Sequence, residues 1–211
     1  MKAAYDSVLF DFDGVLADTE PIHWQCWRQI LAPLGIELPW DVYCANCIGV
    51  VDTDMLSFLA SLGPAVTAEA LRPHYPKKKE LFRTRVLEAT PCAAETVELV
   101  RSLTDYRLAV VSSSGRQEVE PVLERAGIHE CFAAMVFGGD VERHKPAPDP
   151  YLLAASRLGV KRPLVVEDSE AGLASARAAG FDVVRVRSSA EVPAMTIARL
   201  RGGSVDARAI R

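Results

Sequence analysis

The 211-residue sequence contains no long hydrophobic run. No stretch of about 18 apolar residues occurs, so neither a transmembrane helix nor a membrane partner is expected. The first residues, MKAAYDSVLFDFD, include acidic side chains and lack a cleavable signal pattern, which predicts a cytoplasmic location. Charge of one sign is not in large excess either. The formal net charge of -4 predicts no general attraction to nucleic acid or to an anionic membrane surface.

Cysteine is scarce and odd in number. The five cysteines (Cys26, Cys44, Cys47, Cys92 and Cys131) are widely scattered, which does not fit a disulfide framework. Cys44 and Cys47 form a CxxC, a spacing found in redox-active thiols and in half of a zinc site. No second CxxC and no strand–turn–helix pattern accompanies them, so two ordinary thiols are predicted.

The composition that is present, 49% hydrophobic and 25% charged residues, is typical of a globular protein with one or two domains. The pattern changes near Pro91. Before it, residues 15 to 90 show helical periodicity and no convincing strand, which predicts a helical insert. After it, continuous apolar strands alternate with helices, as in a doubly wound α/β protein with a parallel sheet covered on both faces. The expected strands are residues 7–12, 107–111, 133–137, 164–167 and 181–186.

The boundaries of several helices can be predicted from capping residues. The first helix is expected to begin at Asp18 as its N-cap and to end near Leu34, and its two apolar stripes predict packing on two sides. Residues 36–50 are expected to form a loop. Asp149 is the expected N-cap of a later helix, and the tail after Ser188 has too weak a pattern to predict an element.

Polar side chains follow four of the predicted strands directly. In parallel sheets, ligands bind at the carboxyl ends of the strands, so four separate loops can contribute to one site. Asp11 and Asp13 are two residues apart at the end of a strand and point to the same face. The groups in question are Asp11, Asp13, Ser112, Lys145, Glu167 and Asp168.

These residue types suit an anionic, oxygen-rich ligand such as phosphate. Adjacent carboxylates stay ionised only where a cation neutralises them, and a set of carboxylates suits Mg²⁺. The hydroxyl of Ser112 can hydrogen-bond an anionic oxygen, and Lys145 supplies a compact positive charge. A carboxylate can also act as a nucleophile that forms an aspartyl-phosphate, and a second one as general acid and base.

Four segments of the sequence resemble the motifs of the haloacid dehalogenase (HAD) superfamily of phosphotransferases, in the family's order. They are DFDGVLADTE, VVSSSG, HKPAPDPY and VVEDSEAG, and they span most of the chain. The resemblance implies that Asp11 is the nucleophile and Asp13 the acid/base, and that Ser112 and Lys145 hold the phosphoryl group.

The resemblance also implies a metal site and a domain organisation. Asp168 would bind Mg²⁺ together with Asp11 and the backbone carbonyl of Asp13, and Glu167 would assist. A Rossmann-like core domain of residues 1–14 and 91–211 would carry the Asp11 strand at the centre of its sheet. Residues 15–90 would form an all-helical C1 cap domain, as in the subgroup of phosphoglycolate phosphatase and β-phosphoglucomutase, closing over the substrate as a lid.

Some residues outside the strongest positions have two interpretations. His23 matches a cap-helix histidine that β-phosphoglucomutase-like members use near the acid/base and the substrate phosphate, or it is a histidine at a domain interface. Ser113 either binds phosphate or turns the chain. One of Lys77–Lys79 could face the substrate phosphate, or all three form a solvated basic face.

The leading hypothesis is a Mg²⁺-dependent phosphatase of a small phosphorylated metabolite, a sugar phosphate or phospho-acid, acting as a monomer or dimer. The alternative is a β-phosphoglucomutase-type isomerase, which His23 favours and the lack of arginine in the run Gly49-Val50-Val51-Asp52 opposes. A dehalogenase proper is disfavoured, because that chemistry needs neither a metal nor Asp13. A non-catalytic phospho-ligand sensor is disfavoured by the complete residue set.

Overall fold

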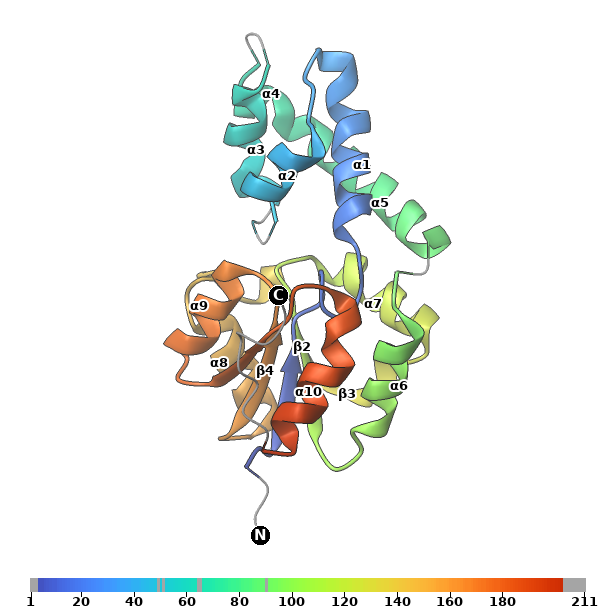
Figure 1. Ribbon diagram of the computed structural model, residues 1–211. Helices are drawn as coiled ribbons and strands as arrows, with labels where there is room; N and C mark the ends of the chain where they lie inside the picture. Colours follow the sequence, from blue (N-terminus) through green and yellow to red (C-terminus); the bar gives the residue numbers. More distant parts are fainter. Residues whose placement is uncertain (1–3, 49, 51, 64–65, 90, 203–211) are drawn as a thin grey trace.

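The computed structural model describes residues 4–48, 50, 52–63, 66–89 and 91–202 (Figure 1). A five-stranded, wholly parallel sheet forms its centre, with the strand order β3-β2-β1-β4-β5. This confirms the expected α/β architecture and the central position of the first strand. The strands are β1 (Ser7–Phe10), β2 (Arg107–Val111), β3 (Phe132–Val136), β4 (Pro163–Glu167) and β5 (Asp182–Arg185).

Alternate residues of each strand enter hydrophobic cores on opposite faces of the sheet. Val8 and Phe10 pack on one face, with α6, α7 and α10, whereas Leu9 packs on the other, with α8 and α9. The strands are therefore apolar on both sides, which explains their continuous apolar sequence. The helices are α6 (Ala94–Ser102), α7 (Arg116–Ala126), α8 (Asp149–Leu158), α9 (Glu170–Ala178) and α10 (Val192–Leu200), with the 3-10 turns η3 (His129–Cys131), η4 (Gly138–Asp140) and η5 (Ser189–Glu191). We call the sheet with these helices the sheet layer.

A second group of helices lies over the carboxyl edge of the sheet and has its own apolar core around Trp27, Tyr43 and Leu59 (Figure 1). We call this group the helical layer. It comprises α1 (Glu20–Leu31), η1 (Ala32–Leu34), α2 (Trp40–Asn46), α3 (Asp52–Ser61), α4 (Ala68–Leu71), η2 (Arg72–His74) and α5 (Tyr75–Ala89). No helix of the described residues is long and apolar enough to span a bilayer.

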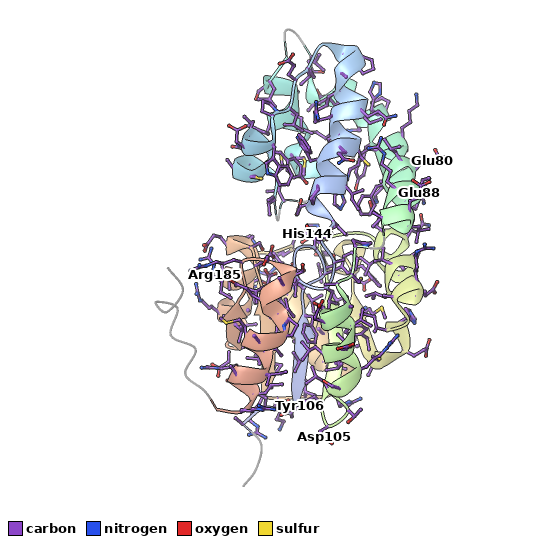
Figure 2. All side chains as sticks on the ribbon, turned by 45° about the vertical axis from the view of Figure 1, so that its right-hand side comes forward. Glu80, Glu88, Asp105, Tyr106, His144 and Arg185 are labelled. Carbon is purple, nitrogen blue, oxygen red and sulfur yellow. The ribbon has the colours of Figure 1, made fainter. Side chains whose placement is uncertain are left out.

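Helix α1 joins the two layers, and its two apolar stripes pack on two sides as predicted. Ile22 and Cys26 belong to the hydrophobic core that contains Val8 and Phe10, whereas Trp27 and Leu31 belong to the core of the helical layer. Helix α5 has one buried and one exposed side. It turns Glu80 outward to solvent (Figure 2), while other side chains on it are buried.

Several predicted boundaries were wrong. Residues 36–50 are not entirely a loop, because α2 begins after the extended Pro39 and buries Tyr43. The N-cap of α1 is Thr19 rather than Asp18, and Asp149 is the first helical residue of α8 rather than its N-cap.

Smaller differences concern the strands, the tail and the thiols. The first strand ends at Phe10, because the chain then turns into the loop that carries the acidic residues. The weakly patterned tail forms α10. The CxxC lies at the end of α2, and Cys44 and Cys47 are not joined by a disulfide. Gly49 and Val51 lie outside the described residues.

Candidate active site

The register of the sheet brings the predicted loops to one edge. Phe10 pairs with Val110 on β2 and with Val166 on β4, so the three strands end at the same level. The residues that follow them, Asp11 and Ser112 among them, therefore lie next to one another beneath the helical layer.

Asp11 is buried at the centre of this edge. Its backbone N–H donates to the carbonyl of Val166 at 3.0 Å, which ties the start of the loop to β4. Its Oδ1 accepts a hydrogen bond of 2.8 Å from Lys145 Nζ. Burial and then the negative charge of Glu167 raise the pKa of Asp11 well above its ordinary value, against the opposing charge of Lys145. Positive charge near Asp11 thus decides whether it is ionised.

Lys145 supplies part of that charge from the loop between β3 and α8. Its Nζ donates to Asp11 Oδ1 at 2.8 Å, to Glu167 Oε1 at 2.6 Å and to the carbonyl of Val111 at 3.1 Å. The ammonium also lies 5.0 Å from the centroid of the Tyr151 ring. Burial opposes its charged form, but the two carboxylates outweigh this cost and raise the pKa of Lys145. Lys145 is therefore a fixed cation.

Glu167 is fully buried and orients its neighbours. Its Oε1 accepts from Lys145 and from the Tyr151 hydroxyl at 3.0 Å. Its Oε2 accepts from the backbone N–H groups of Asp168 and Ser169, both at 2.9 Å. Against the cost of burial, the charge and hydrogen bond of Lys145 lower the pKa of Glu167. The charge at this position is thus retained inside the protein.

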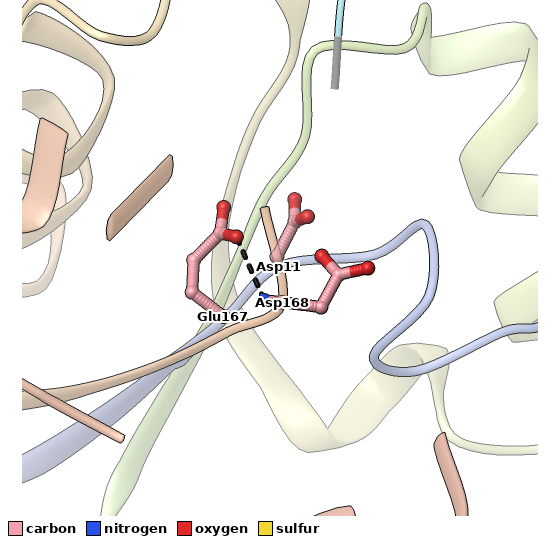
Figure 3. A group of neighbouring side chains, drawn as sticks. All are labelled: Asp11, Glu167 and Asp168. Carbon is pink, nitrogen blue, oxygen red and sulfur yellow. Dashed lines mark hydrogen bonds between the residues drawn. The ribbon is translucent and has the colours of Figure 1, made fainter. Parts of the chain in front are cut away.

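Asp11, Glu167 and Asp168 form an acidic group (Figure 3), in which one carboxylate oxygen from each residue lies within 4.8 Å of the other two. Burial and then the charge of Glu167 raise the pKa of Asp168 to about 7. Three carboxylates with one neighbouring lysine carry uncompensated negative charge, and an all-oxygen donor set fits a hard divalent cation such as Mg²⁺. The carboxylate of Asp13 faces a different set of partners, so any contribution of Asp13 to this group would come from its backbone.

Gly14 permits the close approach of Asp168 to the first loop. Its φ of +77° is in the left-handed region, and a Cβ at this position would lie 2.1 Å from Asp168 Oδ2. Any other residue would strain the turn and displace this carboxylate.

Asp13 is surrounded by hydrogen-bond donors. Thr19 Oγ1 donates to its Oδ1, and Ser114 Oγ donates to its Oδ2 at 2.8 Å. His23 Nε2 lies 3.5 Å from Oδ1. Burial alone would raise the pKa of Asp13, but His23, Thr19 and Ser114 outweigh it and lower the pKa to about 2. Asp13 is therefore ionised in this arrangement.

His23 reaches Asp13 from α1 and is held from α5. It is 5% exposed, stacks on Phe82 with 3.9 Å between ring centroids, and its Nδ1 is 2.6 Å from Lys78 Nζ. Because an ammonium group has only donors, Nδ1 accepts and the ring proton resides on Nε2, the nitrogen that faces Asp13. The structure thus places His23 both at the interface of the layers and beside Asp13.

Of the three serines after β2, two line the cavity and one is buried. Ser112 Oγ is buried, accepts from the backbone N–H of Ser114 at 2.9 Å and lies 3.3 Å from Asp13 Oδ2, to which it donates. Ser113 and Ser114 line the cavity, whereas Ser112 is not among the described lining residues. The carbonyl of Ser113 packs so closely on Gly138 that a Cβ there would lie 2.3 Å away.

A cavity lies between the two layers and connects these groups. Its floor comes from the sheet layer and its roof from α1, α2, α3 and α5. His144, beside Lys145 in sequence, is half-buried and is not one of the lining side chains (Figure 2). The principal lining residues are Asp11, Asp13, Ser113, Lys145 and Asp168 below, and Glu20, His23, Tyr43 and Met55 above.

The sequence analysis missed several residues that hold the site together. Lys78 was one of three lysines with two interpretations, yet it is fully buried beside His23. A signal was present: Lys78, Phe82 and Val86 follow helical spacing on the buried face of α5. Tyr151 and Gly172 are the last residues of the segments HKPAPDPY and VVEDSEAG, but their roles depend on the packing of α8 and α9 against Glu167.

A model of the family "haloacid dehalogenase-like hydrolase" matches residues 8–186, which is most of the chain and includes all the site residues described above. The chain therefore belongs to the haloacid dehalogenase-like hydrolase family. This confirms the predicted family and the prediction of an enzyme of this class.

Named relatives and solved structures agree with this assignment. The fructose-1-phosphate phosphatase YqaB of Escherichia coli is 34% identical over 193 residues, which cover 89% of this chain and 99% of the relative. A phosphorylated carbohydrates phosphatase of Thermotoga maritima is 31% identical over 180 residues, covering 84% and 82%. The crystal structure of β-phosphoglucomutase from Clostridium difficile shares the fold, with a TM-score of 0.80, 19% identity, and coverage of 94% of this chain and 97% of that chain.

Proposed function

We propose that the protein is a phosphatase that hydrolyses a small phosphorylated metabolite, in the first place a sugar phosphate, through an aspartyl-phosphate on Asp11. The observation that carries the proposal is the pairing at the sheet edge. One buried carboxylate is held by Lys145 at 2.8 Å, and a second, two residues on, is surrounded by donors. The activities named for the two phosphatase relatives support a sugar-phosphate substrate.

The first step transfers the phosphoryl group to the protein. An Oδ of Asp11 attacks phosphorus and forms a new P–O bond, while the ester P–O bond breaks. The leaving oxygen takes a proton from Asp13 and departs as an alcohol. With a pKa of about 2, Asp13 is ionised before substrate arrives. The negative charge of the incoming phosphoryl group raises the pKa of Asp13, so Asp13 takes up a proton from solvent as the substrate binds.

The second step returns the enzyme to its starting state. Asp13, now a carboxylate, accepts a proton from a water molecule as the water oxygen attacks phosphorus. The bond between phosphorus and Asp11 breaks, releasing inorganic phosphate and the Asp11 carboxylate. Asp13 then loses to solvent the proton that it took from water. The donors Thr19 and Ser114 hold Asp13 in place for both proton transfers.

The residues that hold the transferring group come from three loops. Lys145 would neutralise charge on the phosphoryl oxygens, and Ser113, which lines the cavity, would donate to them. Ser112 and Ser114 donate to Asp13 in this structure, so either would donate to the phosphoryl oxygens only by turning its hydroxyl away from Asp13. Asp11, Asp168, Glu167 and the backbone carbonyl of Asp13 would hold Mg²⁺. When bound, the ion would supply positive charge to the phosphoryl oxygens and offset the repulsion within the acidic group. The all-oxygen donor set fits this ion.

A β-phosphoglucomutase-type isomerase is the second candidate. The position of His23, 3.5 Å from Asp13, favours it, because a sugar hydroxyl in place of water would approach the same pair. The lack of an arginine in residues 49–52 opposes it, because a bisphosphate intermediate needs a second phosphate clamp.

Phosphate release from a panel of phosphorylated metabolites, with Mg²⁺ and with chelator, tests the proposal. We expect phosphate from sugar phosphates with Mg²⁺ and none with chelator. Asp11→Asn should reduce turnover at least about 10³-fold, because the amide is a poor nucleophile, while the unfolding temperature stays near that of the parent. Retained turnover in this variant would remove Asp11 from the nucleophile role. Glucose 6-phosphate formed from β-glucose 1-phosphate without free phosphate would instead identify a mutase.

A further inference from the structure

The cavity is lined by two further carboxylates that the proposed reaction does not use, one from each layer. Glu20 is the first residue of α1 and lines the cavity. Its Oε2 accepts a hydrogen bond of 2.6 Å from the Tyr43 hydroxyl of α2. This contact fixes the carboxylate of Glu20 at the roof of the site. Burial raises the pKa of Glu20.

Glu118, near the start of α7, lines the same cavity and is 4% exposed. Its Oε2 accepts from the backbone N–H of Gly115 at 2.9 Å and lies 3.5 Å from Lys79 Nζ. Its Oε1 is buried and accepts no hydrogen bond from any residue that the structure describes. A buried carboxylate oxygen without a donor is costly, and a ligand hydroxyl would remove that cost.

The charge of the cavity also restricts the ligand. Lys145 is the only lysine or arginine among the described lining residues, and its donors already serve Asp11 and Glu167. A second anionic group on a substrate would therefore face Glu20 and Glu118, and the nearby cation Lys79 does not line the cavity and is already paired with Glu118 at 3.5 Å. Neutral hydroxyl groups would find acceptors there instead.

We infer that Glu20 and Glu118 accept hydrogen bonds from the hydroxyl groups of the substrate, and that the site selects phosphomonoesters whose remainder is an uncharged polyhydroxy chain or ring. This inference rests on the proposed phosphatase function. It disfavours phospho-acids and bisphosphates, and it assigns the two carboxylates to substrate selection rather than to the reaction at phosphorus.

Matched pairs of substrates test the selection by charge. The pairs are glucose 6-phosphate against 6-phosphogluconate and fructose 1-phosphate against fructose 1,6-bisphosphate, compared by kcat/KM for phosphate release. We expect the member with the uncharged remainder to be preferred at least about tenfold in each pair. Equal values, or a preference for the anionic member, would overturn the inference.

Three variants assign the selection to the two residues. Glu20→Gln and Glu118→Gln should each reduce the preference at least about threefold, because the charge that repels the second anion is lost. Glu124→Gln, which removes an exposed charge from the same helix as Glu118, should leave the preference unchanged. A preference unaltered in both active-site variants would contradict the assignment.

A separate measurement tests the proposed phosphatase function. Release of nitrophenol from p-nitrophenyl phosphate reports phosphatase activity without a polyhydroxy group. No release from this compound or from any sugar phosphate would refute the proposed function itself. Release without discrimination between the paired substrates would refute only the inference drawn from Glu20 and Glu118.

Discussion

At the scale of single residues, the two aspartates after β1 differ because their neighbours differ. Asp11 faces Lys145 and the acidic group, and burial raises its pKa. Asp13 faces hydroxyl and imidazole donors, which lower its pKa to about 2. Taken by themselves, these shifts run opposite to the roles of nucleophile and acid/base. A cation bound beside Asp11 would keep Asp11 ionised, and a phosphoryl group beside Asp13 would favour the protonated form of Asp13.

Asp13→Asn tests the second of these roles. The amide cannot carry the proton to the leaving oxygen or accept one from water, so formation and breakdown of the phospho-enzyme should both slow by about 10²–10⁴-fold. Rapid-quench measurements of phospho-enzyme give the two rates. Asp18→Asn, which alters an exposed carboxylate on the same segment, is the matched control. Unchanged rates for both steps in Asp13→Asn would dismiss Asp13 as the acid/base.

At the scale of elements, the sequence of helix α9 leaves space for the carboxylate of Glu167, which precedes the helix. Gly172 lies inside α9, where alanine would ordinarily be the better helix former by about 1 kcal/mol. A Cβ at this position would however lie 1.7 Å from Glu167 Oε1. The glycine therefore serves the packing of helix against strand end and not the helix itself.

Gly172→Ala should consequently destabilise the protein. Displacing the fully buried Glu167 carboxylate disrupts its hydrogen bonds to Lys145 and Asp168, and overpacking of this kind costs about 1–3 kcal/mol, which exceeds the gain in helix propensity. Urea unfolding measures the change. Gly139→Ala is the control, since a Cβ there meets no atom within 4 Å. A Gly172→Ala variant as stable as the parent would show that α9 can move away from Glu167.

At the scale of the whole molecule, the chain crosses between the layers twice at one place. The backbone N–H of Asp18 donates to the carbonyl of Pro91 at 3.0 Å. Val15, Leu16 and Ala17 are fully buried in the core of the sheet layer. We therefore propose that the two layers are separate domains that meet at Asp18 and Pro91, slightly beyond the boundary at residues 14 and 15 that the sequence predicts.

Replacing residues 19–90 by a short Gly–Ser linker tests this division. The adjoining ends can be closed without strain, so the sheet layer should still unfold cooperatively in urea. It should be less stable than the full chain, because Phe82 and Val86 no longer cover its core. Turnover of sugar phosphates should be lost with Glu20 and His23. A non-cooperative transition would show that the layers fold as one unit.

The sequence by itself determined the parallel sheet and the residues at its carboxyl edge, and the resemblance to the family placed the first strand at its centre. The reason is local: apolar strands followed by Asp11, Ser112 or Asp168 specify what each loop carries, and parallel strands bring loops to the same edge. The family motifs added the expected roles.

Only the tertiary structure decided how those residues are held and what faces them. The pairing of Lys78 with His23, the space left by Gly172 and the carboxylates of Glu20 and Glu118 over the site arise between elements distant in sequence. Such contacts depend on how helices pack on the sheet edge, and packing leaves only a weak trace in local sequence patterns. The walls of the cavity, which we infer select the substrate, are therefore a property of the folded chain.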